Sequence, residues 1–230
     1  MRRSLASLWV AYVLMVLNVF GWLYASLKMA LAHGDAPVAL AKPINGAMLL
    51  ANGAADGATV FGGAWWRLIT AQFLHVQPLH LALNLVGLYC LGRYVETALG
   101  AMRFAAIYFG AGTLGMLASV VAAPALVSSG ASQAILGLVG ASLAYLSLVW
   151  RDMREWRWPS RFALGLGLLY GAIQISLDIA TVHTVKSGHL AGLLAGFALG
   201  YLLTWPAKWR GTRHATNEQA AIPARTRERL

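Results

Sequence analysis

The sequence predicts an all-α membrane protein built as a bundle of six transmembrane helices. Hydrophobic residues make up 59% of the 230 residues and charged residues only 11%, whereas a soluble domain averages about 25% charged residues. A hydrocarbon core about 30 Å thick requires roughly 20 consecutive apolar residues. Six runs of about this length occur, and we expect each to form one helix. They cover approximately residues 8–31, 79–98, 104–122, 132–150, 162–181 and 184–205.

The first run, residues 8–31, is expected to remain in the protein as a helix. It is longer than the apolar region of a secretory signal peptide, and no small-residue cleavage motif clearly follows a shorter core.

The single cysteine, Cys90, lies in the second run, and one cysteine excludes a disulfide framework. We expect Cys90 to pack as a small apolar side chain.

The longest connection, about residues 32–77, is predicted to lie on the outer side of the membrane. Turn signals such as Asn52-Gly53 punctuate it. A loop of this length without a function would be unusual. Near its end Trp65 and Trp66 precede an arginine, and this mixture is typical of a segment at the headgroup level.

The other helices have recognisable starts. The second is expected to begin at Pro78, because proline suits the first helical position and Gln77 before it is biased away from helical geometry. The fourth opens at Ser132, in the stretch SSGASQAILGLVGA that follows Pro124. A short, basic, Trp-rich loop, residues 151–161, precedes the fifth helix, and the sixth opens with KSGHLAGLLAGFALG.

The distribution of Lys and Arg predicts the orientation of the bundle. Six helices put both termini on one side, and 14 of the 18 Lys and Arg residues lie on that side. An excess of positive charge marks the cytoplasmic side, so we expect a multi-pass protein of a bacterial inner membrane with both termini in the cytoplasm. We divide the chain into one membrane domain, residues 1–206, and a basic, disordered cytoplasmic tail, residues 207–230. The net charge of +10 reflects this topology, and no recognisable nucleic-acid-binding module accompanies it.

Polar residues at membrane depth are the default candidates for function, and here they gather at the outer ends of three helices. His80 and Asn84 lie four residues apart in the second helix and therefore share a face. Ser132 begins the fourth helix and His189 opens the sixth. The even-numbered helices all start on the outer side, so these polar ends lie at similar depth and can converge.

Taken singly, each of these residues has a structural explanation, such as a helix N-cap for Ser132. Small residues strengthen the functional interpretation, because faces of small residues let two helix backbones approach closely. Glycines recur at every fourth position of the sixth helix, at Gly188, Gly192, Gly196 and Gly200. Close packing against the fourth helix would bring His189 within hydrogen-bond reach of Ser132. A serine hydroxyl with a histidine beside it as general base is the smallest set of groups that makes an activated nucleophile.

The remaining polar groups suit the stabilisation of a tetrahedral intermediate, which requires donors aimed at the developing negative charge. The amide of Ser132 lies at a helix N-terminus, where amides are free and the helix dipole favours anions. His80 and Asn84 offer side-chain donors. These parts make a Ser–His dyad without a carboxylate, and we interpret Asp178 as a local hydrogen-bonding residue at the outer end of the fifth helix.

Five short motifs follow one another between about residues 66 and 203. They are Trp66-Arg67, His75-x4-His80-x3-Asn84, Gly92-Arg93-x2-Glu96, Gly130-Ala131-Ser132 and His189-x2-Gly192. In their order and spacing they resemble the motifs of the rhomboid intramembrane serine proteases. The resemblance implies a six-helix fold with a water-accessible cavity that opens outwards. It further implies Ser132 as nucleophile, His189 as general base and then acid, and an oxyanion site made of His80, Asn84 and the Ser132 amide.

Two positions depart from the family pattern. Gln133 replaces the second glycine of the motif Gly-x-Ser-Gly, and its larger side chain is expected to narrow the cleft or to supply a further donor. Leu136 stands where the family usually has an aromatic residue that packs beneath the catalytic histidine. Neither change removes a reacting group. By the same resemblance, Arg67 and Glu96 correspond to structural polar residues.

The leading interpretation is a serine endopeptidase that uses no cofactor or metal and cleaves transmembrane segments of membrane-protein substrates within the lipid bilayer. The alternative is a catalytically inactive rhomboid-like protein that binds membrane clients; Ser132 and His189 argue against it, and Gln133 argues for it. A transporter would need a polar path through the membrane, whereas the polar residues crowd one side. A zinc protease is disfavoured because His75 and His80 lack an H-E-x-x-H frame.

Overall fold

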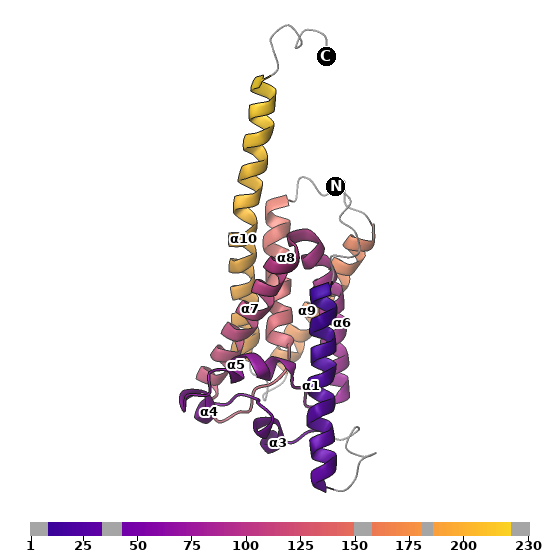
Figure 1. Cartoon of the computed structure of the whole chain (residues 1–230), viewed down its shortest axis with the longest axis vertical. Coiled ribbons are helices and arrows are strands. Elements are labelled where there is room, and N and C mark those ends of the chain that lie inside the picture. Colours follow the sequence, from indigo (N-terminus) through magenta and orange to yellow (C-terminus); the bar gives the residue numbers. More distant parts are fainter. Residues whose placement is uncertain (1–8, 34–42, 150–157, 181–185, 222–230) are drawn as a thin grey trace.

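The protein is a bundle of long helices with a set of short helices at one end (Figure 1). The computed structural model describes residues 9–33, 43–149, 158–180 and 186–221, and beyond residue 204 only the backbone of the last helix. The long helices are α1 (Trp9–His33), α6 (Pro78–Leu99), α7 (Ala101–Ala122), α8 (Ser132–Val149), α9 (Trp158–Ala180) and α10 (Lys186–Ala221). The short ones are α3 (Gly46–Ala51), α4 (Gly57–Phe61), α5 (Arg67–Thr70) and the 3₁₀ helix η2 (Ala71–Phe73).

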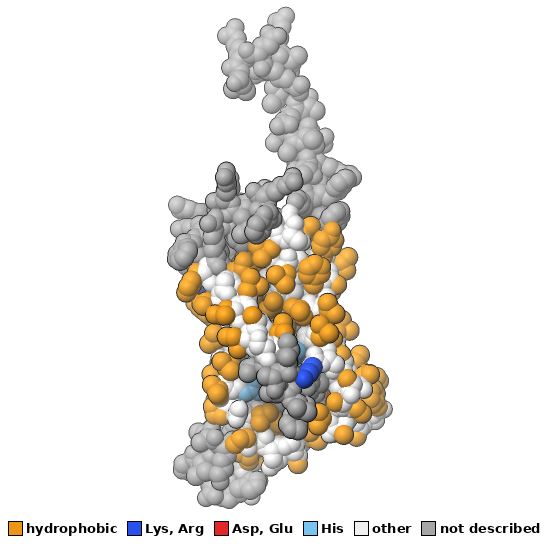
Figure 2. Space-filling view, turned by 180° about the vertical axis from the view of Figure 1, so that it is seen from behind, with side chains coloured by type: hydrophobic (Ala, Val, Ile, Leu, Met, Phe, Trp, Pro, Cys, Tyr) orange, Lys and Arg blue, Asp and Glu red, His pale blue; other side chains and the backbone are white. Residues whose placement is uncertain are grey.

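Each of the six predicted apolar runs forms a helix, so the all-α prediction is confirmed. Among the described residues, three helical segments are long and apolar enough to cross a membrane, namely Trp9–Ala32, Ala101–Ala122 and Lys186–Thr204. A fourth span results if Arg67–Phe73 and Pro78–Leu99, which meet at 99°, count as one. α8 and α9 carry shorter apolar stretches. Hydrophobic side chains cover the face of the bundle in Figure 2, as expected of a surface in contact with lipid.

Helix α6 begins at Pro78, as predicted, and the same residues explain the bend before it. Pro78 occupies the first turn of α6, and Gln77 before it is extended, with φ −154° and ψ 160°. Proline lacks the amide that an upstream helical turn would use, and it disfavours helical geometry in the residue before it. The chain therefore turns sharply between η2 and α6.

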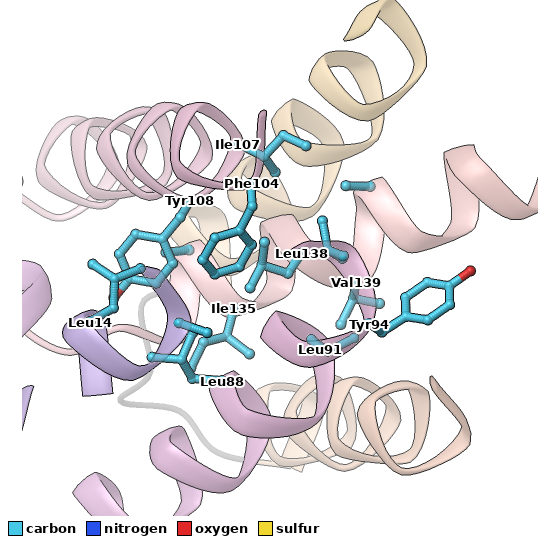
Figure 3. Packing of buried hydrophobic residues seen from close by; sticks show 14 of the residues in the cluster. Leu14, Leu88, Leu91, Tyr94, Phe104, Ile107, Tyr108, Ile135, Leu138 and Val139 are labelled. Carbon is cyan, nitrogen blue, oxygen red and sulfur yellow. The ribbon is translucent and has the colours of Figure 1, made fainter. Parts of the chain in front are cut away.

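α8 lies at the centre of the bundle and contacts α6, α7, α9 and α10. Its residues from Ser132 to Ser142 are all buried. Figure 3 shows how Ile135, Leu138 and Val139 of α8 pack against aliphatic side chains of α6 and aromatic side chains of α7. Because apolar side chains surround α8, its first residue is held at a fixed depth within the protein.

A carboxylate holds α1 against the rest of the bundle. Glu96 of α6 is fully buried, and its two oxygens accept hydrogen bonds from the backbone amides of Val10 and Ala11, at 3.2 and 2.9 Å. These amides lie in the first turn of α1, where the helix has no internal acceptors for them. The positive end of the α1 dipole favours a negative charge at this point. Glu96 therefore has the structural role that the sequence analysis expected.

The described part of the segment between α1 and α6, residues 43–77, is held by polar contacts to its backbone. Arg67 Nη1 donates to the carbonyl oxygens of Leu50 and Ala54, each at 2.7 Å, and the guanidinium stacks on the Trp66 ring at 4.7 Å. Asp56 caps α4. Hydrogen bonds from the Thr59 hydroxyl and amide keep the pKa of the Asp56 carboxyl below its ordinary value of 3.8. An isolated β-bridge joins this loop, at Ala55, to Ser128 in the segment leading to α8.

The last helix is longer than the sequence analysis anticipated. α10 runs to Ala221, through most of the segment where a disordered tail was expected. Nine of the 15 residues 207–221 are Ala, Lys, Arg, Gln or Glu, which are strong helix formers and favour the extension, whereas Pro206 and Gly211 oppose it. In Figure 1 the extension projects beyond the other helices, at the end of the bundle opposite α3 and α4.

We predict that Glu96→Ala destabilises the protein by about 2–4 kcal/mol, because two buried amides lose a charged acceptor. Equilibrium unfolding in detergent micelles measures the effect. Glu96→Gln keeps one carbonyl acceptor and should cost less. Thr97→Ala on the same helix is the matched control, because the exposed Thr97 hydroxyl bonds only to the Arg93 carbonyl of its own helix. Equal losses from Glu96→Ala and Thr97→Ala would show that the carboxylate does not hold α1.

Candidate active site

Ser132 is the first residue of α8, and the preceding loop fixes its position. The Gly130 amide donates to the Ala71 carbonyl oxygen at 2.9 Å, which ties the loop to η2. Gly130 has φ +114°, a conformation that side-chain-bearing residues rarely adopt. A Cβ at Gly130 would also lie 2.8 Å from Cε1 of His80. Glycine is therefore required here both by the backbone and by the histidine ring beside it.

Ser132 and His189 form a hydrogen-bonded pair. Ser132 Oγ lies 2.7 Å from His189 Nε2, and the two residues are only 3% and 8% exposed. His189 lies in the first turn of α10, so both residues are at helix starts. The sequence analysis selected these two residues, 57 positions apart, and the structure brings them into contact.

Backbone contact between α8 and α10 makes this approach possible. A Cβ at Gly192 would collide with the Gln133 carbonyl, one at Gly196 with the Gly137 backbone, and one at Gly200 with Ala141. Any side chain at these glycines would push α10 outwards. Three glycines of the expected small face, Gly192, Gly196 and Gly200, therefore meet α8. The fourth, Gly188, faces Gly115 and Ser119 of α7.

His80 and Asn84 lie beside the same loop. Asn84 is buried, its Nδ2 donates to the His80 carbonyl oxygen at 3.0 Å, and its Oδ1 accepts from the Tyr170 hydroxyl at 3.0 Å. A Cβ built at Gly130 would lie 3.0 Å from His80 Nε2 and 3.9 Å from Asn84 Nδ2. The ring and the amide thus meet the backbone two residues before Ser132, which is the region where the sequence analysis expected oxyanion donors.

His75 is buried under this cluster, and its ring meets that of His80 edge-on, with centroids 5.1 Å apart. It contacts the site through His80. The side chain of Asp178 lies outside the described residues. Among the residues that the structure describes, no group of three His, Cys, Asp or Glu side chains is arranged to hold a metal ion.

The two residues that depart from the family pattern are both buried. Gln133 is 3% exposed, and its Cβ and Cγ lie against Gly115 of α7. Its Oε1 is 3.4 Å from Ser132 Oγ and is a second acceptor for the single hydroxyl proton, besides His189 Nε2 at 2.7 Å. Leu136 is fully buried in the central apolar cluster. The side chain of Gln133 is thus an interhelical packing group that also reaches the serine hydroxyl.

The sequence analysis missed Tyr170. It is a single tyrosine in the apolar run of α9, and such residues usually serve packing or the membrane interface. Which helix faces α9 is a matter of tertiary structure. Only the contact between α6 and α9 reveals that the Tyr170 hydroxyl reaches Asn84.

Comparisons with known proteins agree with this geometry. A family model described as "Rhomboid domain" matches residues 62–206. The chain is 37% identical, over 149 residues, to "Rhomboid protease GluP" of Bacillus subtilis (strain 168). This match covers 64% of the chain and 27% of that protein. The chain is also 34% identical, over 129 residues, to "Rhomboid-like protease 3" of Toxoplasma gondii. This match covers 56% of the chain and 48% of that protein.

The name of a further relative describes it as inactive. "Inactive RHOMBOID-like protein 8" of Arabidopsis thaliana is 38% identical over 85 residues, which cover 37% of this chain and 24% of that protein. The matched regions make up less than half of the length of each of these three relatives. The family model covers residues 62–206, a range that includes Ser132 and His189.

We predict opposite effects for two Gly→Ala changes. Gly196→Ala should destabilise the protein by about 1–3 kcal/mol, because its methyl group meets the Gly137 backbone in a packed interface. Gly165→Ala, on α9, is the matched control: a Cβ there meets nothing within 4 Å, and alanine favours a helix by about 1 kcal/mol over glycine. Unfolding in detergent micelles measures both. A Gly196→Ala protein as stable as Gly165→Ala would contradict backbone contact between α8 and α10.

Proposed function

The chain belongs to the rhomboid family, and on this premise we propose that it is an intramembrane serine endopeptidase that cleaves transmembrane segments of membrane-protein substrates through a Ser132–His189 dyad. The observation that carries the proposal is the 2.7 Å separation of Ser132 Oγ and His189 Nε2. A hydroxyl is a weak nucleophile unless a neighbouring base takes its proton as it attacks. The separation is within the range that such a transfer needs.

The chemistry follows the roles of the two groups. Ser132 Oγ attacks the scissile carbonyl carbon while its proton passes to His189 Nε2, and a tetrahedral oxyanion forms. When the C–N bond breaks, His189 returns the proton to the leaving nitrogen, and an ester to Ser132 remains. Water then attacks this ester and gives a proton to His189. When the ester bond breaks, His189 passes this proton to Ser132 Oγ, and the acid product leaves.

Donors near the first turn of α8 would stabilise the oxyanion. We propose the Ser132 amide together with the side chains of His80 and Asn84. The proximity of both side chains to Gly130 supports this assignment, because Gly130 leads directly into the helix that Ser132 begins. Fixed donors are effective in a water-poor site because they require no reorganisation during the reaction.

The burial of the site implies a class of substrate. A transmembrane helix hides its scissile amides within its own hydrogen bonds, so substrates should carry Gly, Ala or Pro near the cut, where these residues weaken the helix. The arginine and lysine distribution supports a site near the outer face of a bacterial inner membrane, with both termini in the cytoplasm.

The second candidate function is a rhomboid-like protein that binds membrane clients without cutting them. Gln133 favours it, because it replaces a motif glycine next to the nucleophile and its Oε1 lies 3.4 Å from Ser132 Oγ. This contact offers the hydroxyl a second acceptor. At 3.4 Å it is a long hydrogen bond compared with 2.7 Å to His189, so the geometry favours the enzyme.

Ser132→Ala and His189→Ala are each expected to abolish cleavage of a membrane-protein substrate reconstituted in vesicles. The double variant should lose little more than either single variant, because residues that act as a unit are not additive. Cleavage is followed by gel, and a fluorophosphonate probe reports the nucleophile in the wild-type chain. Ser147→Ala, further along α8, is the matched control, because the Ser147 hydroxyl bonds to the Ala144 carbonyl of its own helix. Substantial turnover by Ser132→Ala would refute the dyad.

Gln133→Gly separates the two candidate functions. We expect it to destabilise the fold by about 1–2 kcal/mol, because glycine weakens the helix and the packing against Gly115 is lost. Labelling of Ser132 by the probe should persist at a similar rate, since the reacting atoms are unchanged. If the probe labels the Gln133→Gly variant but not the wild-type chain, then Gln133 prevents the reaction of Ser132. That result would favour the binding function.

A further inference from the structure

A hydrogen bond from another helix fixes the side chain of Asn84. The Tyr170 hydroxyl of α9 donates to Asn84 Oδ1 of α6 at 3.0 Å. We propose that Tyr170 is a positioning residue of the active site, which holds the Asn84 amide with its N–H groups directed toward the oxyanion. The proposal rests on the proposed protease function and assigns Tyr170 a role within it.

The hydrogen bonds on Asn84 determine which way its amide faces. A carbonyl oxygen can only accept, so the group that faces the His80 carbonyl at 3.0 Å must be Nδ2. The oxygen then faces Tyr170, and the phenol must donate to it. One N–H of Nδ2 is used by His80, and the other remains for a further acceptor. Nδ2 is also the Asn84 atom nearest to a Cβ built at Gly130, at 3.9 Å.

Rotation of the amide would have a large consequence. If the carboxamide turned over, its oxygen would face the region beside Gly130, where negative charge develops during catalysis. A lone pair there would repel the oxyanion that an N–H would stabilise. The bond to His80 comes from the same helix and constrains one end of the amide. Tyr170 constrains the other end from a second helix, and together they exclude the reversed orientation.

The surroundings of the tyrosine ring fix where its hydroxyl lies. Gly87, one turn after Asn84 on α6, provides the space for the ring: a Cβ at Gly87 would lie 3.0 Å from Tyr170 Cζ and 3.1 Å from its Cε1. Ile135 of α8 borders the same space, because the Gly87 Cβ would also lie 3.0 Å from its Cγ2. The ring is thus held between α6 and α8, and the phenol oxygen is carried to Asn84.

The test compares Tyr170→Phe with the wild type in cleavage of a membrane-protein substrate in vesicles. Loss of one hydrogen bond corresponds to about a 3- to 10-fold effect. We therefore expect kcat to fall by about 3- to 10-fold with KM unchanged, because the donor remains but is no longer held. Asn84→Ala removes the donor and should cost about 100- to 1,000-fold. Adding Tyr170→Phe to Asn84→Ala should have no further effect, since Tyr170 acts through Asn84.

Tyr89→Phe is the matched control. Tyr89 lies on α6 and is 42% exposed, and removal of its hydroxyl should change neither kcat nor KM. Two outcomes would overturn the proposal. One is a rise in KM with kcat unchanged in Tyr170→Phe. The other is an equal loss from Tyr170→Phe with and without Asn84, which would mean that the tyrosine does not act through the amide.

A second measurement does not depend on activity. The side-chain amide resonances of Asn84 in the ¹⁵N-labelled protein, assigned with Asn84→Ala, should shift in Tyr170→Phe and remain unchanged in Tyr89→Phe. Unchanged resonances in Tyr170→Phe would overturn the positioning role even in an active enzyme. If the resonances shift but the wild-type chain neither cleaves substrate nor reacts with a fluorophosphonate, the protease function itself fails, and with it the catalytic purpose of the contact.

Discussion

The contact of two helix backbones, α8 against α10, is the constraint on which the rest of the site depends. Glycines on α10 face the backbone of α8 at Gln133, Gly137 and Ala141, with no room for a Cβ between them. In a membrane the hydrophobic effect does not drive helices together, so close packing and polar contacts must do so. A Cβ inserted into this interface would push α10 away from α8 and would thereby separate Ser132 from His189.

Polar groups also join segments of the bundle outside this central pair. Glu96 of α6 accepts hydrogen bonds from the first turn of α1, and Arg67 donates to two carbonyl oxygens of the segment between α1 and α6. Each of these groups would be costly inside an apolar environment without partners. Each is paired with free backbone groups at a helix end or in a loop, where such partners are available. The polar residues of the bundle therefore specify which segments meet.

The sequence predicted the helices well because their signal is local. Apolar length, Pro78 and the glycine spacing of α10 are visible without knowledge of the fold, and the structure contains the corresponding helices and contacts. The pair Ser132 and His189 was accessible for the same reason, since both residues open helices that start on one side. Tyr170 and the direction of the Gln133 side chain were not accessible, because they depend on which helices are neighbours. The helical continuation to Ala221 was missed because a basic, polar composition was weighted above helix propensity.

The glycine that the family motif has at position 133 bears on the same packing. No residue in the described part of the chain other than glycine has a positive φ, and Gln133 is helical, so the backbone at this position does not require glycine. The remaining reason for a glycine is space between α8 and its neighbours. Here Gly115 on α7 supplies that space, because its missing Cβ would lie 2.7 Å from Gln133 Cβ and 2.8 Å from the Gly188 carbonyl oxygen. Gly115 thus accommodates the Gln133 side chain between α7 and α8.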